Sequence, residues 1–212
     1  FDGTPSRVCR GYASTYAGGA MAAAHALATG EADVSLCLMG GQTHARRDCA
    51  SGFSYVNDVV LSILQLLRVP APDPQPERRV LFVNVDGHHC SGVEEAFFTT
   101  DRVCTVSLHR YAVGIFPGSG GLADVGAEQG KHHNINLPVA DGLDDAGLAL
   151  LLHPVLTAVA ERFCPHCVVV CAGGGILAGD RLGCLNVSLD GHAAYLKLLL
   201  DLGLPTLVLG AG

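Results

Sequence analysis

The chain has 212 residues, of which 49% are hydrophobic and 16% charged, and its formal net charge at pH 7 is −7. This composition predicts a folded domain with a sizeable core and argues against disorder. The negative charge argues against general affinity for nucleic acid or anionic membranes, because both require clustered Lys and Arg, although a basic peptide is not excluded. The nine cysteines, an odd number, indicate free thiols in a reducing compartment.

The first half of the chain alternates helical and extended patterns. Ala20–Thr29 is rich in alanine and is followed by Gly30, which predicts a helix with a C-terminal glycine. Val34–Met39 predicts a buried strand, and Asn57–Arg68 repeats Val and Leu at helical spacing. The proline-rich stretch Val69–Pro76 then predicts an extended surface loop, with a ligand for a proline-binding partner as the alternative.

The second half continues the alternation. Strands are predicted at Val80–Val85, Val103–Leu108 and Asn134–Leu137, and the acidic pair at 144 and 145 predicts the start of a helix that runs to Arg162. Cys167–Cys171 is a further apolar strand, followed by three glycines at 173–175. Asp190 is expected to cap a helix through Asp201, and Pro205 precedes the last predicted strand, Thr206–Leu209.

Apolar strands separated by helices are typical of a parallel sheet that is covered on both faces. We therefore predict an α/β fold with three layers, α/β/α, around a mainly parallel sheet, formed by a single domain over residues 1–212. The start at Phe1 and the end just after the last strand predict that both ends are cuts through a larger domain. No stretch of the sequence reaches the ~20 apolar residues of a membrane span, so no membrane association is expected.

The strand Val80–Val85 ends in Asp86, Gly87 and His88. Side chains two positions apart on an extended chain point the same way, so Asp86 and His88 can converge at the carboxyl end of the strand. A catalytic zinc site takes three protein ligands and leaves one position for water. These residues supply two of them, and the function depends on whether a third exists.

Other residues near predicted strand ends have both a functional and a structural interpretation. His44 is a candidate general base or a structural histidine. Phe53 lines a channel or is a core aromatic at a turn. His89 faces away from His88 and is expected to be buried and hydrogen-bonded, and Ser91 could orient His44 or His89. Asp180 is expected to cap a loop or form an ion pair, and Arg181 beside it is an open candidate for contact with a partner.

The chain resembles the zinc-dependent histone deacetylase family, and most closely its class I branch. The resemblance extends from Phe1 almost to the end of the chain. It depends on seven short motifs, none of which is specific alone but which are highly specific together. The motifs are Gly40–Ala45, Ala50–Asp58, Val83–His89, Gly92–Phe97, Phe116–Gly120, Gly142–Asp145 and Gly179–Cys184.

The resemblance implies the arginase/deacetylase fold and the hydrolysis of N-acetyl-lysine. In the family, zinc polarises the amide carbonyl and the attacking water, a histidine pair transfers protons, and a tyrosine stabilises the oxyanion. An acetyl-lysine peptide or histone tail is the implied substrate, and a corepressor-type complex is an implied partner. The nucleus is the implied location, with the cytoplasm as the alternative.

The family's reaction centre carries over incompletely. Asp86 and His88 match two zinc ligands, whereas the third, an aspartate in the family, is Gly175 here. His44 matches the second catalytic histidine, whereas the first is Thr43. The aspartate partner of the second histidine is replaced by a serine at position 91, and the oxyanion tyrosine lies beyond the end of this sequence.

The resemblance also assigns supporting residues. The substrate channel would be lined by Gly52, Phe53, Phe116 and Leu182. Arg181 matches a rim position where class I members meet corepressors and inositol phosphates. A structural potassium ion is implied on the carbonyls of Asp86, His88 and Leu108 and the hydroxyl of Ser107, beside Asn84, which replaces a family aspartate.

The losses at Thr43, Ser91 and Gly175 all concern one reaction centre. The sequence therefore predicts a catalytically impaired family member with weak or absent zinc, acting as a scaffold or regulator, in which His44 is a residual base. The alternative is an active deacetylase with rearranged ligands, for example a thiol from Cys90 or Cys171, or one completed by segments outside this sequence. A gene remnant without a role is a third interpretation.

Overall fold

The computed structural model describes residues 7–70 and 77–211, so the proline-rich stretch at 71–76 lies outside the described residues. Six strands form one sheet in the order β1-β6-β5-β2-β3-β4, and every neighbouring pair is parallel. The predicted α/β class and parallel sheet are therefore confirmed. The strands are β1 (Val34–Cys37), β2 (Val80–Val85), β3 (Val103–Arg110), β4 (Asn134–Val139), β5 (Cys167–Ala172) and β6 (Thr206–Leu209).

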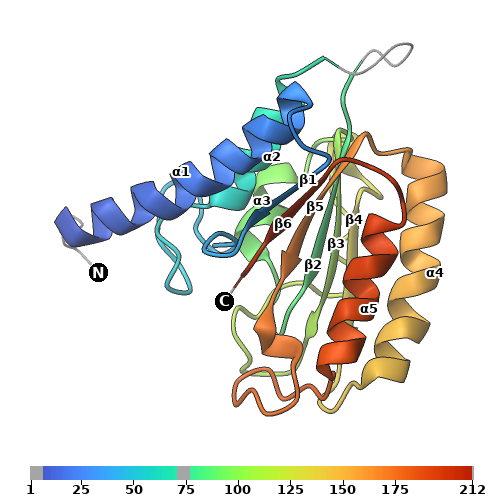
Figure 1. The fold of residues 1–212 in the computed structure, drawn as a ribbon. Helices are drawn as coiled ribbons and strands as arrows, with labels where there is room; N and C mark the ends of the chain where they lie inside the picture. Colours follow the sequence, from blue (N-terminus) through green and yellow to red (C-terminus); the bar gives the residue numbers. More distant parts are fainter. Residues whose placement is uncertain (1–6, 71–76, 212) are drawn as a thin grey trace.

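The central strands are buried because helices cover both faces of the sheet (Figure 1). Every residue of β2 is buried, and its run of Val, Leu and Phe has no polar face, as expected for a parallel strand between two helical layers. One layer consists of α1 (Arg7–Thr29), α2 (Asp58–Leu67) and α3 (Ser91–Phe97), and the other of α4 (Asp145–Phe163) and α5 (Leu189–Leu200). Each layer packs its own apolar cluster against the sheet.

Several element boundaries and one helix cap differ from the sequence prediction, most of them by one or two residues. The first helix begins at Arg7 rather than Ala20, because residues before Ala20 also pack, and the buried Tyr16 donates a hydrogen bond to the carbonyl of Val56 at 2.9 Å. β1 ends at Cys37, since the chain turns and exposes the next two side chains. The last helix is capped by Ser188, whose hydroxyl accepts the N–H of Gly191, and not by Asp190.

Two further features were not predicted. The helix α3 has only seven residues, too few for a periodic pattern to be distinguished. Cys164 and Cys167 have CxxC spacing, which the sequence reading overlooked, but Cys164 is exposed at the end of α4 while Cys167 is buried in β5, and both are free. A redox motif of the thioredoxin kind precedes a helix rather than following one, so this pair has a structural explanation.

The prediction that no segment is long and apolar enough to span a membrane was wrong for α4. This helix has 19 residues and a mean hydropathy of 1.3 over its most apolar window. Part of its apolar content has a structural cause, because Leu148, Leu152, Leu156 and Val159 recur at helical spacing and pack against the sheet, although only 28% of the window is buried.

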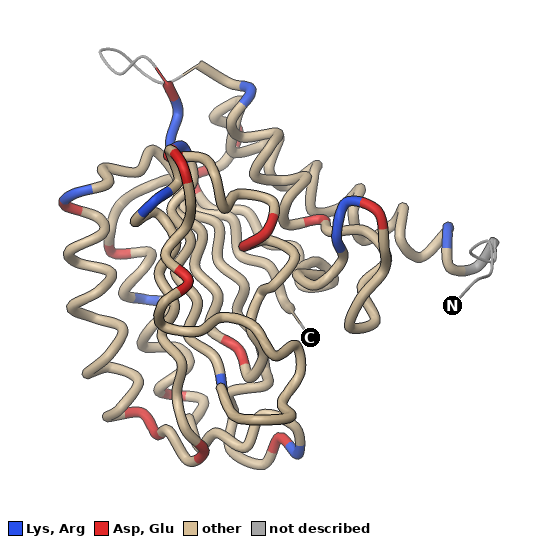
Figure 2. The backbone as a smooth tube through the Cα atoms, turned by 180° about the vertical axis from the view of Figure 1, so that it is seen from behind, with Lys and Arg blue, Asp and Glu red and all other residues tan. Residues whose placement is uncertain are grey.

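Basic and acidic residues are few and scattered when the molecule is seen from behind (Figure 2).

Candidate functional site

The carboxyl ends of β2 and β5 lie side by side, since Val85 is in register with Ala172. Asp86 follows β2, and the three glycines at 173–175 follow β5. A Cβ atom added at Gly173 would lie 2.5 Å from Asp86 Oδ1, and one at Gly175 only 2.3 Å from the same atom. The Asp86 carboxylate therefore lies against these glycines and fills the space that a side chain at position 175 would need.

Backbone donors hold the Asp86 carboxylate in this position. The N–H of Gly87 donates to Oδ1 at 2.7 Å. Burial raises the pKa of the Asp86 carboxyl, while the N–H groups of Gly87 and Gly175 and the neighbouring His88 act to lower it. In residues 7–70 and 77–211, no group of three or more His, Cys, Asp or Glu side chains is arranged to hold a metal ion. Two donors, one of them turned towards glycine backbone, do not fit a three-ligand zinc site.

His88 lies in an aromatic cluster with His44 and Phe116. The imidazole centroids of His44 and His88 are 6.3 Å apart with planes at 88°, and the Phe116 ring centroid is 4.9 Å from His44 and 6.1 Å from His88. Residues far apart in the sequence, which the resemblance placed in one reaction centre, thus lie together in the fold. The cluster forms one side of the open edge at the end of β2.

His44 faces Ser91, as one of the sequence interpretations proposed, but the contact is weak. His44 Nδ1 is 3.5 Å from Ser91 Oγ, at the limit of a hydrogen bond. Burial, together with the nearby His88 and His89, lowers the pKa of His44 to about 4. The imidazole is therefore neutral at pH 7, and no carboxylate at position 91 stabilises its protonated form.

The start of α2 positions the loop that carries Thr43 and His44, a role that the sequence analysis missed. Asn57 Nδ2 donates to the carbonyls of Thr43 at 3.1 Å and Ala45 at 2.9 Å. The buried Asp58 accepts the N–H groups at positions 41 and 42 at 2.9 and 2.8 Å. The sequence does show two adjacent polar residues, Asn57 and Asp58, at the start of an apolar helix. Such a pair is equally typical of an ordinary helix N-cap, so it did not indicate contacts to the loop at 41–45.

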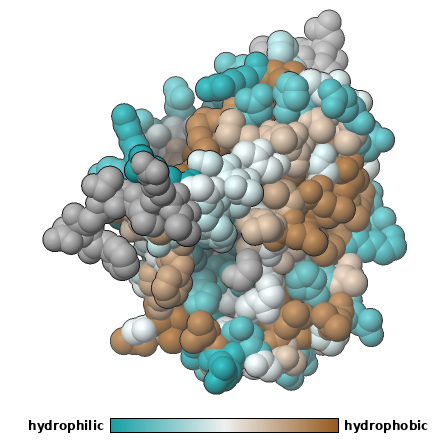
Figure 3. Space-filling view, turned by 60° about the vertical axis from the view of Figure 1, so that its left-hand side comes forward, coloured by the Kyte–Doolittle hydropathy of each residue, from teal (hydrophilic) through white to brown (hydrophobic). Residues whose placement is uncertain are grey.

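The candidate channel residues Phe53, Phe116 and Leu182 are all exposed, and Gly52 packs against two rings of the cluster. Phe53 is 98% exposed, Leu182 69% and Phe116 44%, so the alternative of Phe53 as a core aromatic is wrong. Gly52 has φ +51°, and a Cβ there would lie 2.7 Å from Phe116 and 2.8 Å from His44, so only glycine fits without displacing a ring. Figure 3 shows hydrophobic side chains along the lower rim, interrupted by hydrophilic ones, and a larger hydrophobic patch on the right-hand flank.

His89 points away from His88, as predicted, into a buried polar network. Its Nε2 is 3.1 Å from Glu94 Oε2 and its Nδ1 is 2.9 Å from Ser119 Oγ. Glu94 also accepts hydrogen bonds from the amides of Asn134 and Asn136. These donors lower the pKa of the Glu94 carboxyl against the opposing effect of its burial.

The thiols considered as substitute zinc ligands lie in the core. Cys90 and Cys171 are fully buried in the cluster between the sheet and the helices α1, α2 and α3. Burial raises the pKa of the Cys90 thiol to about 12 and raises that of Cys171 well above its usual value. Both thiols are therefore protonated at neutral pH when no metal is bound.

The loop after η2 (Gly174–Ile176) forms the rim of the site. Asp180 accepts the N–H groups of Leu182 at 2.8 Å and Gly183 at 2.6 Å, so its predicted role as a loop cap is confirmed. Arg110, at the end of β3, donates to the carbonyl of Leu182 at 3.2 Å and anchors the loop from the neighbouring strand. Arg181 is exposed on this rim.

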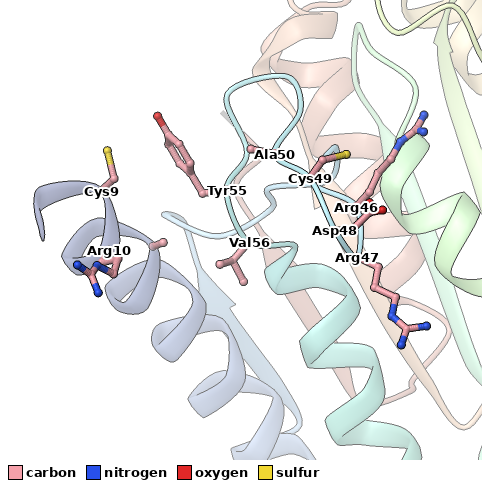
Figure 4. A pocket seen from close by; sticks show the side chains of 10 residues that line it. Cys9, Arg10, Arg46, Arg47, Asp48, Cys49, Ala50, Tyr55 and Val56 are labelled. Carbon is pink, nitrogen blue, oxygen red and sulfur yellow. The ribbon is translucent and has the colours of Figure 1, made fainter. Parts of the chain in front are cut away.

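A separate hollow of about 320 Å³ lies between the start of α1 and the loop before α2 (Figure 4). Arg10, Arg46 and Arg47 are among its lining residues, and Arg46 pairs with Glu95 at 3.3 Å. His44, Asp86 and His88 do not line it. The candidate reaction centre is thus the open strand edge and not this hollow.

The sequence was compared with known proteins. The model of the histone deacetylase domain matches residues 4–212. Similar curated proteins include histone deacetylase 6 of Arabidopsis thaliana (46% identical; 92% of this chain, 40% of the relative), histone deacetylase RPD3 of Saccharomyces cerevisiae (44%; 95% and 45%) and histone deacetylase 1 of Homo sapiens (45%; 92% and 39%). The chain therefore spans less than half the length of these relatives.

Proposed function

Because this chain belongs to the histone deacetylase family, we propose that it is a catalytically impaired member that acts as a scaffold or regulator. Its partner would be an acetyl-lysine peptide such as a histone tail, held in the channel and not hydrolysed, within a corepressor-type complex. The proposed location is the nucleus, and residues 1–212 would form one deacetylase-like domain.

The position of the Asp86 carboxylate is the observation that carries this proposal. Family chemistry requires zinc to polarise the amide and its attacking water. Here one of the two remaining ligands is turned onto Gly175 and bonded to backbone N–H groups. A metal ion would have to draw Asp86 away from these donors and would then gain only two protein ligands. We therefore expect weak zinc binding.

Proton transfer is impaired for a second, independent reason. His44 is neutral and can accept a proton, but its partner Ser91 is uncharged and 3.5 Å away. Thr43 offers no imidazole where the family has its other histidine. Since positioned acid–base groups each contribute roughly 10²–10⁴-fold to the rate, the loss of this machinery alone would abolish most turnover.

The proposed binding of an acetyl-lysine peptide is supported by the channel residues that this chain retains. The exposed rings of Phe53 and Phe116 provide apolar walls for the methylene chain of an acyl-lysine, and Gly52 can pack closely against Phe116 and His44 because it has no Cβ. The alternative of an active deacetylase is favoured by one observation, that the relatives are more than twice as long as the matched segment. Segments outside this sequence could then supply the missing ligand.

The proposal is tested by metal content and acetate release, measured on the full-length protein. We expect zinc well below one equivalent and no acetate from acetyl-lysine peptides, with peptide binding retained. The triple variant Gly175→Asp, Thr43→His, Ser91→Asp should recover zinc binding, because the new carboxylate both displaces Asp86 and adds a ligand.

Gly175→Ala is the matched control. Its Cβ also displaces Asp86 but adds no donor, so it should not recover zinc. Stoichiometric zinc together with acetate release by the wild-type protein, lost in His88→Ala, would establish the active alternative. A triple variant with unchanged zinc uptake would show that ligand loss was not the defect.

A further inference from the structure

A buried amide occupies the region where the resemblance implies a structural potassium ion. Asn84 lies in β2, fully buried and in register with Ser107 of β3. Its Nδ2 donates to the carbonyl oxygen of His88 and to Ser107 Oγ, both at 3.1 Å. Both acceptors are groups that would coordinate the ion. The amide hydrogens therefore point at the oxygens that a cation would need.

The hydrogen bonds around Ser107 show that Asn84 is the donor and Ser107 Oγ the acceptor in the bond between them. His109 Nε2 is 3.0 Å from the carbonyl of Gly120, and because a carbonyl only accepts, Nε2 carries the proton. Nδ1 of the neutral ring is then an acceptor, and Ser107 Oγ, 2.9 Å away, donates to it. Ser107 has thus used its only proton, so its oxygen must accept from Asn84.

The opposite orientation of the Asn84 amide is disfavoured for the same reason. It would place Oδ1 against the carbonyl oxygen of His88 and against a hydroxyl whose proton is already used. The observed orientation leaves Asn84 Oδ1 buried without a hydrogen-bond partner among the described residues. Such an orphaned acceptor costs stability, so the two donated bonds must outweigh it.

The carbonyl of Leu108 accepts the N–H of Asp86 at 3.3 Å, a bond that continues the ladder between β2 and β3 and leaves a second lone pair. It is therefore the Asn84 amide that opposes a cation. The residues present do not fit a potassium site, since a cation needs a shell of oxygen atoms and finds this amide donating to two of the implied ligands, the His88 carbonyl and Ser107 Oγ. A carboxylate at position 84 could only accept, and would leave the same oxygens without these donors.

We infer that the side-chain amide of Asn84 replaces the structural cation, so that this protein folds independently of potassium. Replacing an aspartate by asparagine exchanges an anion that needs a counter-ion for a neutral group that carries its own donors. This inference concerns the support beneath the site and not its chemistry. It can fail or succeed whatever the zinc and acetate measurements show.

The test compares thermal midpoints of the full chain in potassium, sodium and choline chloride at equal ionic strength. The wild-type midpoint should be the same in potassium and choline. Asn84→Asp should be destabilised in choline and rescued by potassium, saturably, with a rise of about 5–10 °C at a concentration 100-fold above its Kd.

Asn57→Asp is the matched control, because the Asn57 amide also donates to two carbonyls, those of Thr43 and Ala45. It should lose stability equally in all three salts. A saturable, potassium-selective rise of the wild-type midpoint would overturn the inference, and this measurement stands even if Asn84→Asp does not fold. A folded Asn84→Asp that responds to potassium no more than Asn57→Asp would overturn it as well.

Discussion

His88 and His89 are neighbours in the sequence, but they belong to two different regions of the molecule. His89 is buried, and both of its ring nitrogens have partners, in Ser119 and in Glu94. His88 lies at the open strand edge, where its neighbours are the rings of His44 and Phe116. In the polar network around His89 the Glu94 carboxylate accepts three hydrogen bonds, whereas at the open edge the contact of His44 with Ser91 is 3.5 Å long.

The contrast between the buried network and the open edge indicates where folding restricts the choice of residues. A buried carboxylate such as Glu94 is stable only if its donors are all present, so a single loss there costs folding. At the open edge, Thr43 and Ser91 are small side chains that are buried without the charged partners that Glu94 requires, and Gly175 is half-buried. Small neutral residues at these three positions are therefore compatible with an intact domain.

The largest expected effect on stability is in the buried network around Glu94. Glu94→Ala should lower the free energy of unfolding by about 3–5 kcal/mol, because it leaves His89, Asn134 and Asn136 without their common acceptor. Urea unfolding measures the change. Glu95→Ala is the control, since Glu95 forms an exposed pair with Arg46, and it should cost less than about 1 kcal/mol. Equal losses in both variants would remove the distinction between the two regions.

An intermediate effect on stability is expected at Asn57, which holds the loop that carries Thr43 and His44. Asn57→Ala should cost about 1–3 kcal/mol, since it removes a helix cap and two hydrogen bonds to the loop before His44. Asn57→Ser keeps a capping oxygen but not the amide donors. Hydrogen exchange of residues 43–45 should then accelerate in both variants, while only Asn57→Ala exposes the first turn of α2.

The stability of the folded protein should also depend on pH through the buried Glu94. The pKa of Glu94 is lowered in the folded state, so its contribution to stability is present above the unfolded-state pKa of about 4.5 and is lost as the pH falls through the lower folded-state value. Unfolding measured between pH 6 and pH 3 should show this loss. Glu94→Gln should be less stable at neutral pH and should show a shallower decline on acidification.

The smallest effect on stability is expected at the open edge. Phe53→Ala should change the free energy of unfolding by no more than about 0.5 kcal/mol, because the ring is 98% exposed. Its affinity for an acetyl-lysine peptide should nevertheless fall, which fluorescence anisotropy would measure. Leu150→Ala, exposed on α4, should change neither quantity. A large loss of stability in Phe53→Ala would mean that this ring packs against the protein and does not line a channel.

The sequence by itself predicted the parallel sheet and the place of the candidate site residues. Apolar, β-branched runs such as Val80–Val85 favour buried strands, and parallel strands bring their carboxyl ends to one edge, so Asp86, His88 and His44 were expected together. The identities at Gly175, Thr43 and Ser91 likewise follow from the chain alone. These features depend on local pattern and on topology, both of which the sequence encodes directly.

Only the tertiary structure decided how the remaining groups are used. The sequence could not show that the Asp86 carboxylate turns onto Gly175, because that depends on the approach of β5 to β2. It could not show that the Asn84 amide faces His88 and Ser107, because side-chain direction in a buried network is set by partners distant in the chain. Hydrogen-bond direction and the filling of space are properties of the packed molecule.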